Sequence, residues 1–199
     1  MQAIKRDEII NIFVRYLLIV VAAANGLWIF YKIFSPLTLY PVYWILSLFF
    51  QVTMFPEELL LLIDMSLEIW LVKACIAGAA YYLLFALNLA VPKIKPVKRI
   101  KMVLFAFSSL LGFNLIRIIL MTFLYYYGFA YADAVHLIFW YGLSIVAVVG
   151  IWFLEVKLFK IKQIPVYSDL MPLFAIARRK KKIKKNFPKK SLSKKKKRA

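Results

Sequence analysis

Long apolar blocks separated by short polar or basic breaks dominate the hydrophobic pattern of this chain. A helix needs roughly 20 residues to cross a bilayer, and the blocks lack the two-residue alternation of a membrane β-barrel. We predict about five transmembrane helices, with approximate bounds 10–33, 38–55, 73–91, 102–125 and 134–155. The expected fold class is an all-α polytopic membrane protein.

Proline-containing breaks define the first two helices. Ser35-Pro36 is expected to end the first one, because proline lacks a backbone donor and clashes with the preceding turn. Pro56-Glu57-Glu58 ends the second block. Over 57–70, apolar patches alternate with Asp64 and Glu68, so we predict a half-buried interfacial segment, or alternatively a short re-entrant element.

Composition supports a membrane location. The chain is 64% apolar, whereas soluble chains are about 45–50% apolar. Its net charge of +19 arises mainly near the C-terminus, where 14 of the 28 Lys and Arg lie between residues 178 and 198. We therefore predict one membrane domain over 1–165 and a cytoplasmic, Lys-rich tail over 166–199 that is disordered toward its end. Phe187 is the only aromatic residue between 178 and 198, so we expect contact with anionic lipid headgroups rather than nucleic acid.

Basic loops predict the orientation. Residues 92–101 contain five cations, and the chain after Lys157 is also basic. Such loops are enriched on the cytoplasmic side, and two predicted helices separate these two segments, so both are expected in the cytoplasm. Counting back through five helices places the N-terminus outside a cell membrane that the chain crosses several times.

Three residues with unusual chemistry lie in or beside the later blocks: Cys75, Arg117 and His136, the first and last being the only cysteine and histidine. At about 1.5 Å per helical residue, Cys75 and Arg117 lie about 25 Å and about 24 Å from the loop at 92–101. His136 lies about 31 Å from Lys157. Since the hydrocarbon core is about 30 Å thick, the three residues are predicted to share the outer boundary of the membrane.

The chemistry of these groups indicates nucleophilic catalysis by a thiol, an imidazole and a guanidinium. Asn114, one helical turn before Arg117, favours an inward-facing arginine over one that snorkels to the interface. Asp133 is expected to orient His136. The alternatives are an inert core cysteine and a structural histidine. One Cys and one His fall short of a zinc site, so we expect no metal and no cofactor.

Other polar and aromatic groups carry weaker signals. The carboxylates of Glu57, Glu58, Asp64 and Glu68 are interpreted as a solvated face rather than a paired acid/base site. The aromatic residues Trp70, Tyr125, Tyr126, Tyr127 and Trp140 are interpreted as interface anchors, or as the lining of a path for a substrate helix.

The order Ala74-Cys75-Ile76-Ala77-Gly78, then Asn114-Leu115-Ile116-Arg117-Ile118, then His136 resembles the exosortase/archaeosortase family over residues 67–152. The short archaeal members fit best. The resemblance implies a membrane-embedded cysteine transpeptidase that acts on surface proteins with a C-terminal sorting signal. That signal consists of a short motif, a transmembrane helix and a basic cluster. One departure is that the glycine following the cysteine stands one place later here, as Gly78.

Carried over to this chain, the resemblance implies that Cys75 is the nucleophile and His136 the acid/base. Arg117 would stabilise the oxyanion or thiolate, and Asn114 would support the site. We therefore expect cleavage outside the membrane through a thioester, with transfer to a lipid-linked or other nucleophile. The alternatives are a non-catalytic membrane scaffold or binding protein, and a small transporter, for which the sequence shows no repeated half.

Overall fold

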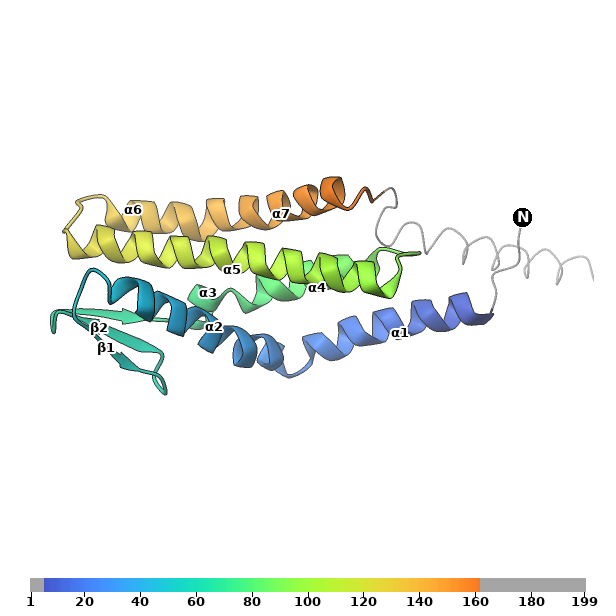
Figure 1. Ribbon diagram of the computed structural model, residues 1–199, viewed down its shortest axis with the longest axis horizontal. Helices are drawn as coiled ribbons and strands as arrows, with labels where there is room; N and C mark the ends of the chain where they lie inside the picture. The colour runs from blue at the N-terminus through green and yellow to red at the C-terminus, as the bar shows by residue number, and fades with distance from the viewer. Residues whose placement is uncertain (1–5, 162–199) are drawn as a thin grey trace, which may run out of the picture.

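Helices running along one long direction form most of the molecule (Figure 1). The computed structural model describes residues 6–161, so the predicted tail at 166–199 lies outside the described residues. The helical elements are α1 (Arg6–Ala23), the 3₁₀-helix η1 (Ala24–Leu27), α2 (Trp28–Leu46), α3 (Lys73–Ile76), α4 (Gly78–Ala90), α5 (Pro96–Tyr126), α6 (Ala132–Leu137), the π-helix η2 (Ile138–Leu143) and α7 (Ser144–Leu158). The strands are β1 (Val52–Phe55), β2 (Leu60–Ile63) and β3 (Leu67–Trp70).

Several helices suit a membrane. Within residues 6–161, three helical stretches are long and apolar enough to cross one: Lys73–Ala90, Pro96–Tyr126 and Ala132–Leu158. A fourth exists if α1 and α2 count as one span that bends by 66°. Large apolar side chains on outer helix faces are exposed, for example Phe13 (67%) and Phe153 (66%), as expected for surfaces that contact lipid. The chain therefore has the character of a multi-pass membrane protein, but a count of five helices is not confirmed.

The predicted helix break at Ser35-Pro36 is in the wrong place. Helix α2 continues through both Pro36 and Pro41, while the chain bends at η1, where Gly26 and Leu27 have φ angles of 63° and 64°. Helices commonly end at a residue in the left-handed conformation. Membrane helices tolerate internal prolines because neighbouring groups satisfy the freed carbonyls. The two predicted spans 10–33 and 38–55 are thus replaced by one bent pair of helices.

The segment predicted to be interfacial forms an antiparallel sheet with strand order β1-β2-β3, so the all-α fold class is wrong for this part of the chain. Val52 pairs with Ile63, and Leu60 pairs with Trp70. The turn between β2 and β3 contains two left-handed residues, Asp64 and Met65, with φ angles of 47° and 54°. The strand signal is the period-two alternation of Leu67-Glu68-Ile69-Trp70, which matches the alternating exposure of β3.

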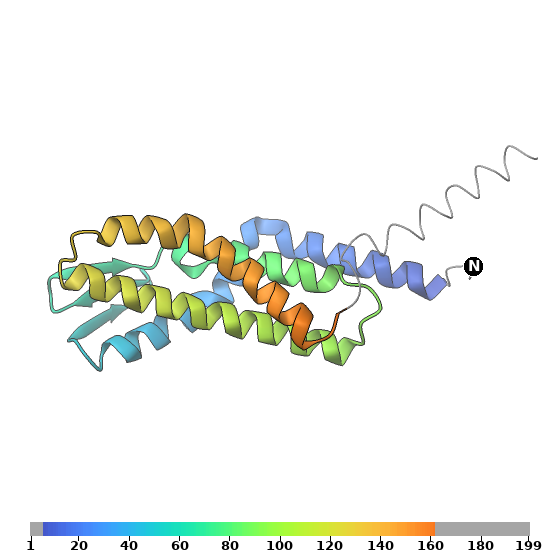
Figure 2. The same ribbon diagram turned by 90° about the horizontal axis from the view of Figure 1, so that it is seen from above.

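The inner face of the sheet packs against the helices. Leu61 and Ile63 of β2 belong to one buried cluster with Leu39 and Val42 of α2 and Ile118 of α5. A second cluster joins α2, α4, α5 and α7. The sheet therefore lies beside the C-terminal part of α5, at the end of the molecule that also holds the α5–α6 turn (Figures 1 and 2).

The opposite end of the molecule holds the start of α1, the α4–α5 loop and the end of α7 (Figure 1). The side chain of Arg15 ties α1 to the end of α4, because its Nη1 donates to the carbonyls of Leu89 and Val91 at 3.2 and 3.0 Å. The start of α1 and the basic loop lie at the same end of the molecule (Figure 1). The predicted placement of the N-terminus opposite that loop followed from a count of five helices, which is not confirmed.

Candidate functional site

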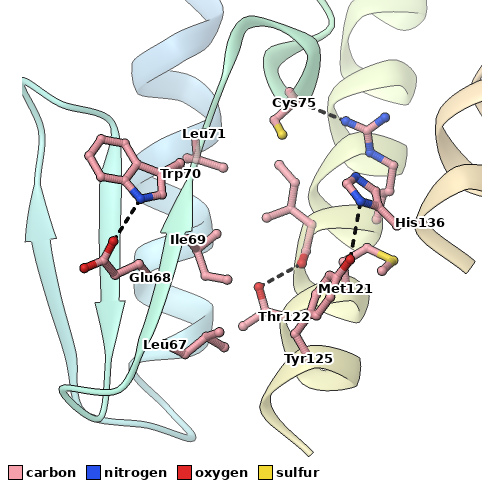
Figure 3. A pocket seen from close by; sticks show the side chains of 12 residues that line it. Leu67, Glu68, Ile69, Trp70, Leu71, Cys75, Met121, Thr122, Tyr125 and His136 are labelled. Carbon is pink, nitrogen blue, oxygen red and sulfur yellow. Dashed lines mark hydrogen bonds between the residues drawn. The ribbon is translucent and has the colours of Figure 1, made fainter. Parts of the chain in front are cut away.

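Cys75, Arg117 and His136 all line one pocket of about 300 Å³. The pocket lies between β3, α3, the C-terminal part of α5 and α6 (Figure 3). Its walls are formed by Leu67, Glu68, Ile69, Trp70, Leu71, Cys75, Arg117, Ile118, Met121, Thr122, Tyr125 and His136. The structure thus brings the three residues together at one level, as the helix lengths predicted.

A break in the helix places the thiol. The single turn of α3 ends at Ile76, and Ala77 adopts the left-handed conformation, with φ 59° and ψ 35°, before α4 begins. Cys75 is half-buried on this short turn. Its sulfur points into the space between β3 and α5 (Figure 3).

The glycine that departs from the family pattern has a packing role. A Cβ atom on Gly78 would lie 2.6 Å from the ring of Tyr31 on α2, so only glycine allows this close approach. The left-handed backbone conformation falls one place earlier, at Ala77. Glycine adopts positive φ without steric cost, and the resemblance described above predicts glycine at this position.

Two side chains of α5 hold the turn that carries the thiol. The buried Asn114 donates from Nδ2 to the carbonyl of Cys75 at 2.6 Å. Nη2 of Arg117 donates to the carbonyls of Ala74 and Cys75 at 3.3 and 3.2 Å. Because α3 stops at Ile76, these carbonyls lie where a continuous helix would have supplied backbone donors. Asn114 and Arg117 therefore clamp the backbone of the Cys75 turn.

Arg117 also links α5 to α7. Its Nη1 donates to the hydroxyl of Ser144 at 3.2 Å, and that hydroxyl in turn donates to the carbonyl of Phe139 at 2.6 Å. Phe139 lies in η2, and π-helical turns often occur at functional sites. Sequence reasoning missed Ser144, although a serine inside an apolar block is a signal of an internal polar partner.

His136 is oriented by a tyrosine rather than directly by the predicted Asp133. The hydroxyl of Tyr125 donates to Asp133 Oδ1 at 2.8 Å and lies 3.5 Å from His136 Nδ1. A hydroxyl has one proton to donate, so toward the imidazole it acts as an acceptor. The contact therefore places a proton on Nδ1, so in the neutral tautomer Nε2 is the basic nitrogen.

The Cys75 thiol, the Arg117 guanidinium and the His136 imidazole surround the pocket without hydrogen bonds among these three side-chain groups in the described residues. Across residues 6–161, no hydrogen bond joins the Cys75 thiol to Arg117 or His136; their bonds go to the partners described above. Hydrogen bonds of a catalytic site often form only when substrate is bound. The open space between the groups is therefore compatible with a substrate chain that fills it.

Two of the four carboxylates between residues 57 and 68, Asp64 and Glu68, make hydrogen bonds in or beside the sheet. Asp64 accepts the backbone N–H of Gln51 at 2.9 Å and the hydroxyl of Tyr126 at 2.7 Å. Glu68 accepts the indole N–H of Trp70 at 3.1 Å, and Glu57 and Glu58 are exposed. In the described part of the chain, no group of three or more His, Cys, Asp or Glu side chains is placed to hold a metal ion.

Comparisons of the chain with protein-family models, with curated proteins and with solved structures find no match. The resemblance to exosortases and archaeosortases therefore stays a prediction from the residues named above.

Proposed function

We propose that this chain is a membrane-embedded cysteine transpeptidase of the exosortase/archaeosortase type. It cleaves the C-terminal sorting signal of surface proteins and transfers the remaining chain to an anchor. The observation that supports this proposal is the shared pocket of Cys75, Arg117 and His136 at one end of a bundle of apolar helices. No metal or cofactor is needed for the chemistry.

In the proposed reaction, the thiolate of Cys75 attacks the carbonyl carbon of the scissile peptide bond. The thiol proton passes to Nε2 of His136, and the same nitrogen then protonates the leaving amine as the C–N bond breaks. A thioester and a free amine result. An incoming hydroxyl or amine attacks the thioester, loses its proton to His136 and restores the thiol.

Arg117 supports the oxyanion in this scheme. Three hydrogen bonds engage Nη1 and Nη2, and a guanidinium has five N–H donors, so two remain for a substrate oxygen. The carbonyl clamp fixes the guanidinium beside the turn that carries the nucleophile. A fixed donor costs little reorganisation when charge develops during the reaction.

The proposed orientation places the pocket at the outer face of the cell membrane. The α4–α5 loop lies at the opposite end of the molecule (Figure 1) and carries Lys93 and Lys95. By the rule that basic loops are cytoplasmic, that end faces the cytoplasm together with the Lys-rich tail, which contacts anionic lipid headgroups.

The test is co-expression with a reporter that ends in a motif, transmembrane helix and basic cluster shared by secreted proteins of the source genome. We expect a shortened reporter with the wild-type chain and no shortening with Cys75→Ala. Cys75→Ser should trap or greatly slow the reaction. Both variants must accumulate in the membrane at the wild-type level. Cleavage by Cys75→Ala at the wild-type rate would exclude the proposal.

A specific observation favours a second candidate, a non-catalytic membrane scaffold. Every hydrogen bond of Arg117 goes to a carbonyl or hydroxyl of a neighbouring helix, as expected for a purely structural residue. A scaffold would keep its interactions when Cys75 is replaced. The same co-expression experiment therefore separates the two functions.

A further inference from the structure

The free edge of strand β3 borders the pocket. The sheet order is β1-β2-β3, so among the described residues β3 pairs with β2 on one side. Every residue from 67 to 71 lines the pocket, although successive side chains belong to opposite faces of the sheet. Residues of both faces line one pocket only if that pocket runs along the edge of the strand.

The alternation of hydrogen-bonded pairs between β2 and β3 identifies the backbone groups on the free edge of β3. Leu71 N–H donates to Leu59 O at 2.9 Å, and antiparallel strands alternate between bonded and non-bonded pairs. The bonded pairs of β3 are therefore at Leu67, Ile69 and Leu71, so the N–H and C=O of Glu68 and Trp70 point away from β2. The carbonyl of Trp70 accepts Val72 N–H at 3.0 Å. The edge thus presents both backbone groups of Glu68 and the N–H of Trp70.

The side chains along the edge differ between the two faces. Leu67, Ile69 and Leu71 point toward α5 and the Cys75 turn, whereas Glu68 and Trp70 point the other way (Figure 3). An extended chain beside β3 would alternate in the same manner. Every second side chain would enter the apolar space next to Met121, and the others would face the Trp70 side.

We propose that the recognition motif of the substrate binds as a fourth, extended strand on the free edge of β3. Main-chain hydrogen bonds to Glu68 and Trp70 supply affinity, and the apolar pocket selects alternate side chains, as in other cases of strand addition. The end of the added strand near Leu71 delivers the scissile carbonyl to Cys75. The proposal rests on the transpeptidase function and adds the mode of substrate recognition.

Site-directed cross-linking tests the proposal. Because Cys75 is the only cysteine, a Cys75→Ala chain with Glu68→Cys has one thiol on β3. Its matched control is Cys75→Ala with Thr53→Cys, an exposed position on the same sheet face of the other edge strand, β1. The probe is the reporter described above, with single cysteines scanned through the segment before its transmembrane helix. We expect disulfides to Glu68→Cys at every second reporter position and few to Thr53→Cys.

The outcomes separate this proposal from the function. If the wild-type chain cleaves the reporter but cross-links show no period of two, or favour β1, strand addition is overturned and the enzyme stands. If the cross-links recur at every second position but the wild-type chain does not cleave the reporter, strand addition is supported and the transpeptidase function is excluded. Disulfides between two copies of the chain at position 68 would show that a second copy occupies the edge, which also overturns the proposal.

A backbone variant gives an independent readout. Glu68→Pro removes an N–H on the free edge without removing a bond to β2, and proline is tolerated on edge strands. We expect about tenfold slower cleavage, equivalent to one hydrogen bond, with little change in thermal stability. Glu68→Ala controls for the lost carboxylate while it keeps the backbone N–H, so the Pro variant should cleave about tenfold more slowly than the Ala variant. Equal rates for the Pro and Ala variants would contradict main-chain pairing at this residue.

Discussion

Helix α5 carries two arginines, Arg99 near its start and Arg117 near its end, that make similar bonds at the two ends of the α3–α4 segment. Arg99 donates to the carbonyls of Leu89 and Val91 at 2.7 and 2.8 Å, whereas Arg117 donates to those of Ala74 and Cys75. The interval between the arginines is about five helical turns, or about 27 Å. Both therefore project from one face of α5.

The difference between the two ends lies in what surrounds each clamp. At the Arg99 end, the bonded carbonyls belong to the C-terminal end of α4, and Arg15 donates to the same two carbonyls. The nearby buried Asn88 donates to Glu155 at 3.1 Å. At the Arg117 end, the clamped residue carries a thiol that opens into a pocket with a histidine. Bonds from an arginine to backbone carbonyls therefore have a structural role at both ends. The pocket is the feature that suggests a catalytic role at the Arg117 end.

Substitution of each arginine by lysine tests whether the two ends of α5 differ in function. Lysine keeps the charge but loses the planar fork, so Arg117→Lys should reduce reporter cleavage at least about 100-fold, a typical loss for an oxyanion donor. Arg99→Lys should remain within about threefold of wild type. Cleavage rates are measured by reporter shortening, and thermal unfolding in detergent is measured for both variants. If Arg117→Lys and Arg99→Lys lose the same amount of activity and the same amount of stability, Arg117 is only a clamp.

Two neighbouring tyrosines sharpen the assignment at the pocket end. Tyr125→Phe removes the hydroxyl between Asp133 and His136. We expect cleavage about three- to tenfold slower, less than the roughly 10²- to 10⁴-fold of an acid–base group itself, because Tyr125 only orients the ring. Tyr126→Phe removes a comparable bond, to Asp64 at 2.7 Å, and should affect stability alone. The measurement is the cleavage rate at matched membrane levels. A larger loss with Tyr126→Phe would argue against orientation of His136 by Tyr125.

The smallest expected effect concerns the backbone of the thiol-bearing turn. Ala77→Gly relieves a left-handed alanine and should stabilise the protein by about 1 kcal/mol. Ala86→Gly, in the interior of α4, should destabilise it by a similar amount. Thermal unfolding of the purified proteins provides the comparison. A loss of stability in Ala77→Gly would mean that the turn relies on the alanine methyl group.

Several features of the fold were predictable from the sequence, and the reasons are local. Helix α5 and the helical stretch Ala132–Leu158 follow the predicted blocks at 102–125 and 134–155 closely, because long apolar runs without breakers have one way to cross a bilayer. The prolines were misleading, since Pro36 and Pro41 lie inside α2. Whether a proline ends a helix depends on neighbouring helices that the local sequence does not specify.

The hydrophobic pattern was enough to predict the long apolar helices and, through the rise of each helix, a common level for Cys75, Arg117 and His136. The sheet over 52–70 became visible only in the folded chain, because pairing of strands depends on partners across a turn. The tertiary structure also decided that Arg117 and Asn114 bind the carbonyls of the Cys75 turn and that the edge of β3 faces the thiol. The rise of a helix depends only on residues within one segment of the chain, so it can be predicted locally. Side-chain partners and strand edges depend on how separate segments pack.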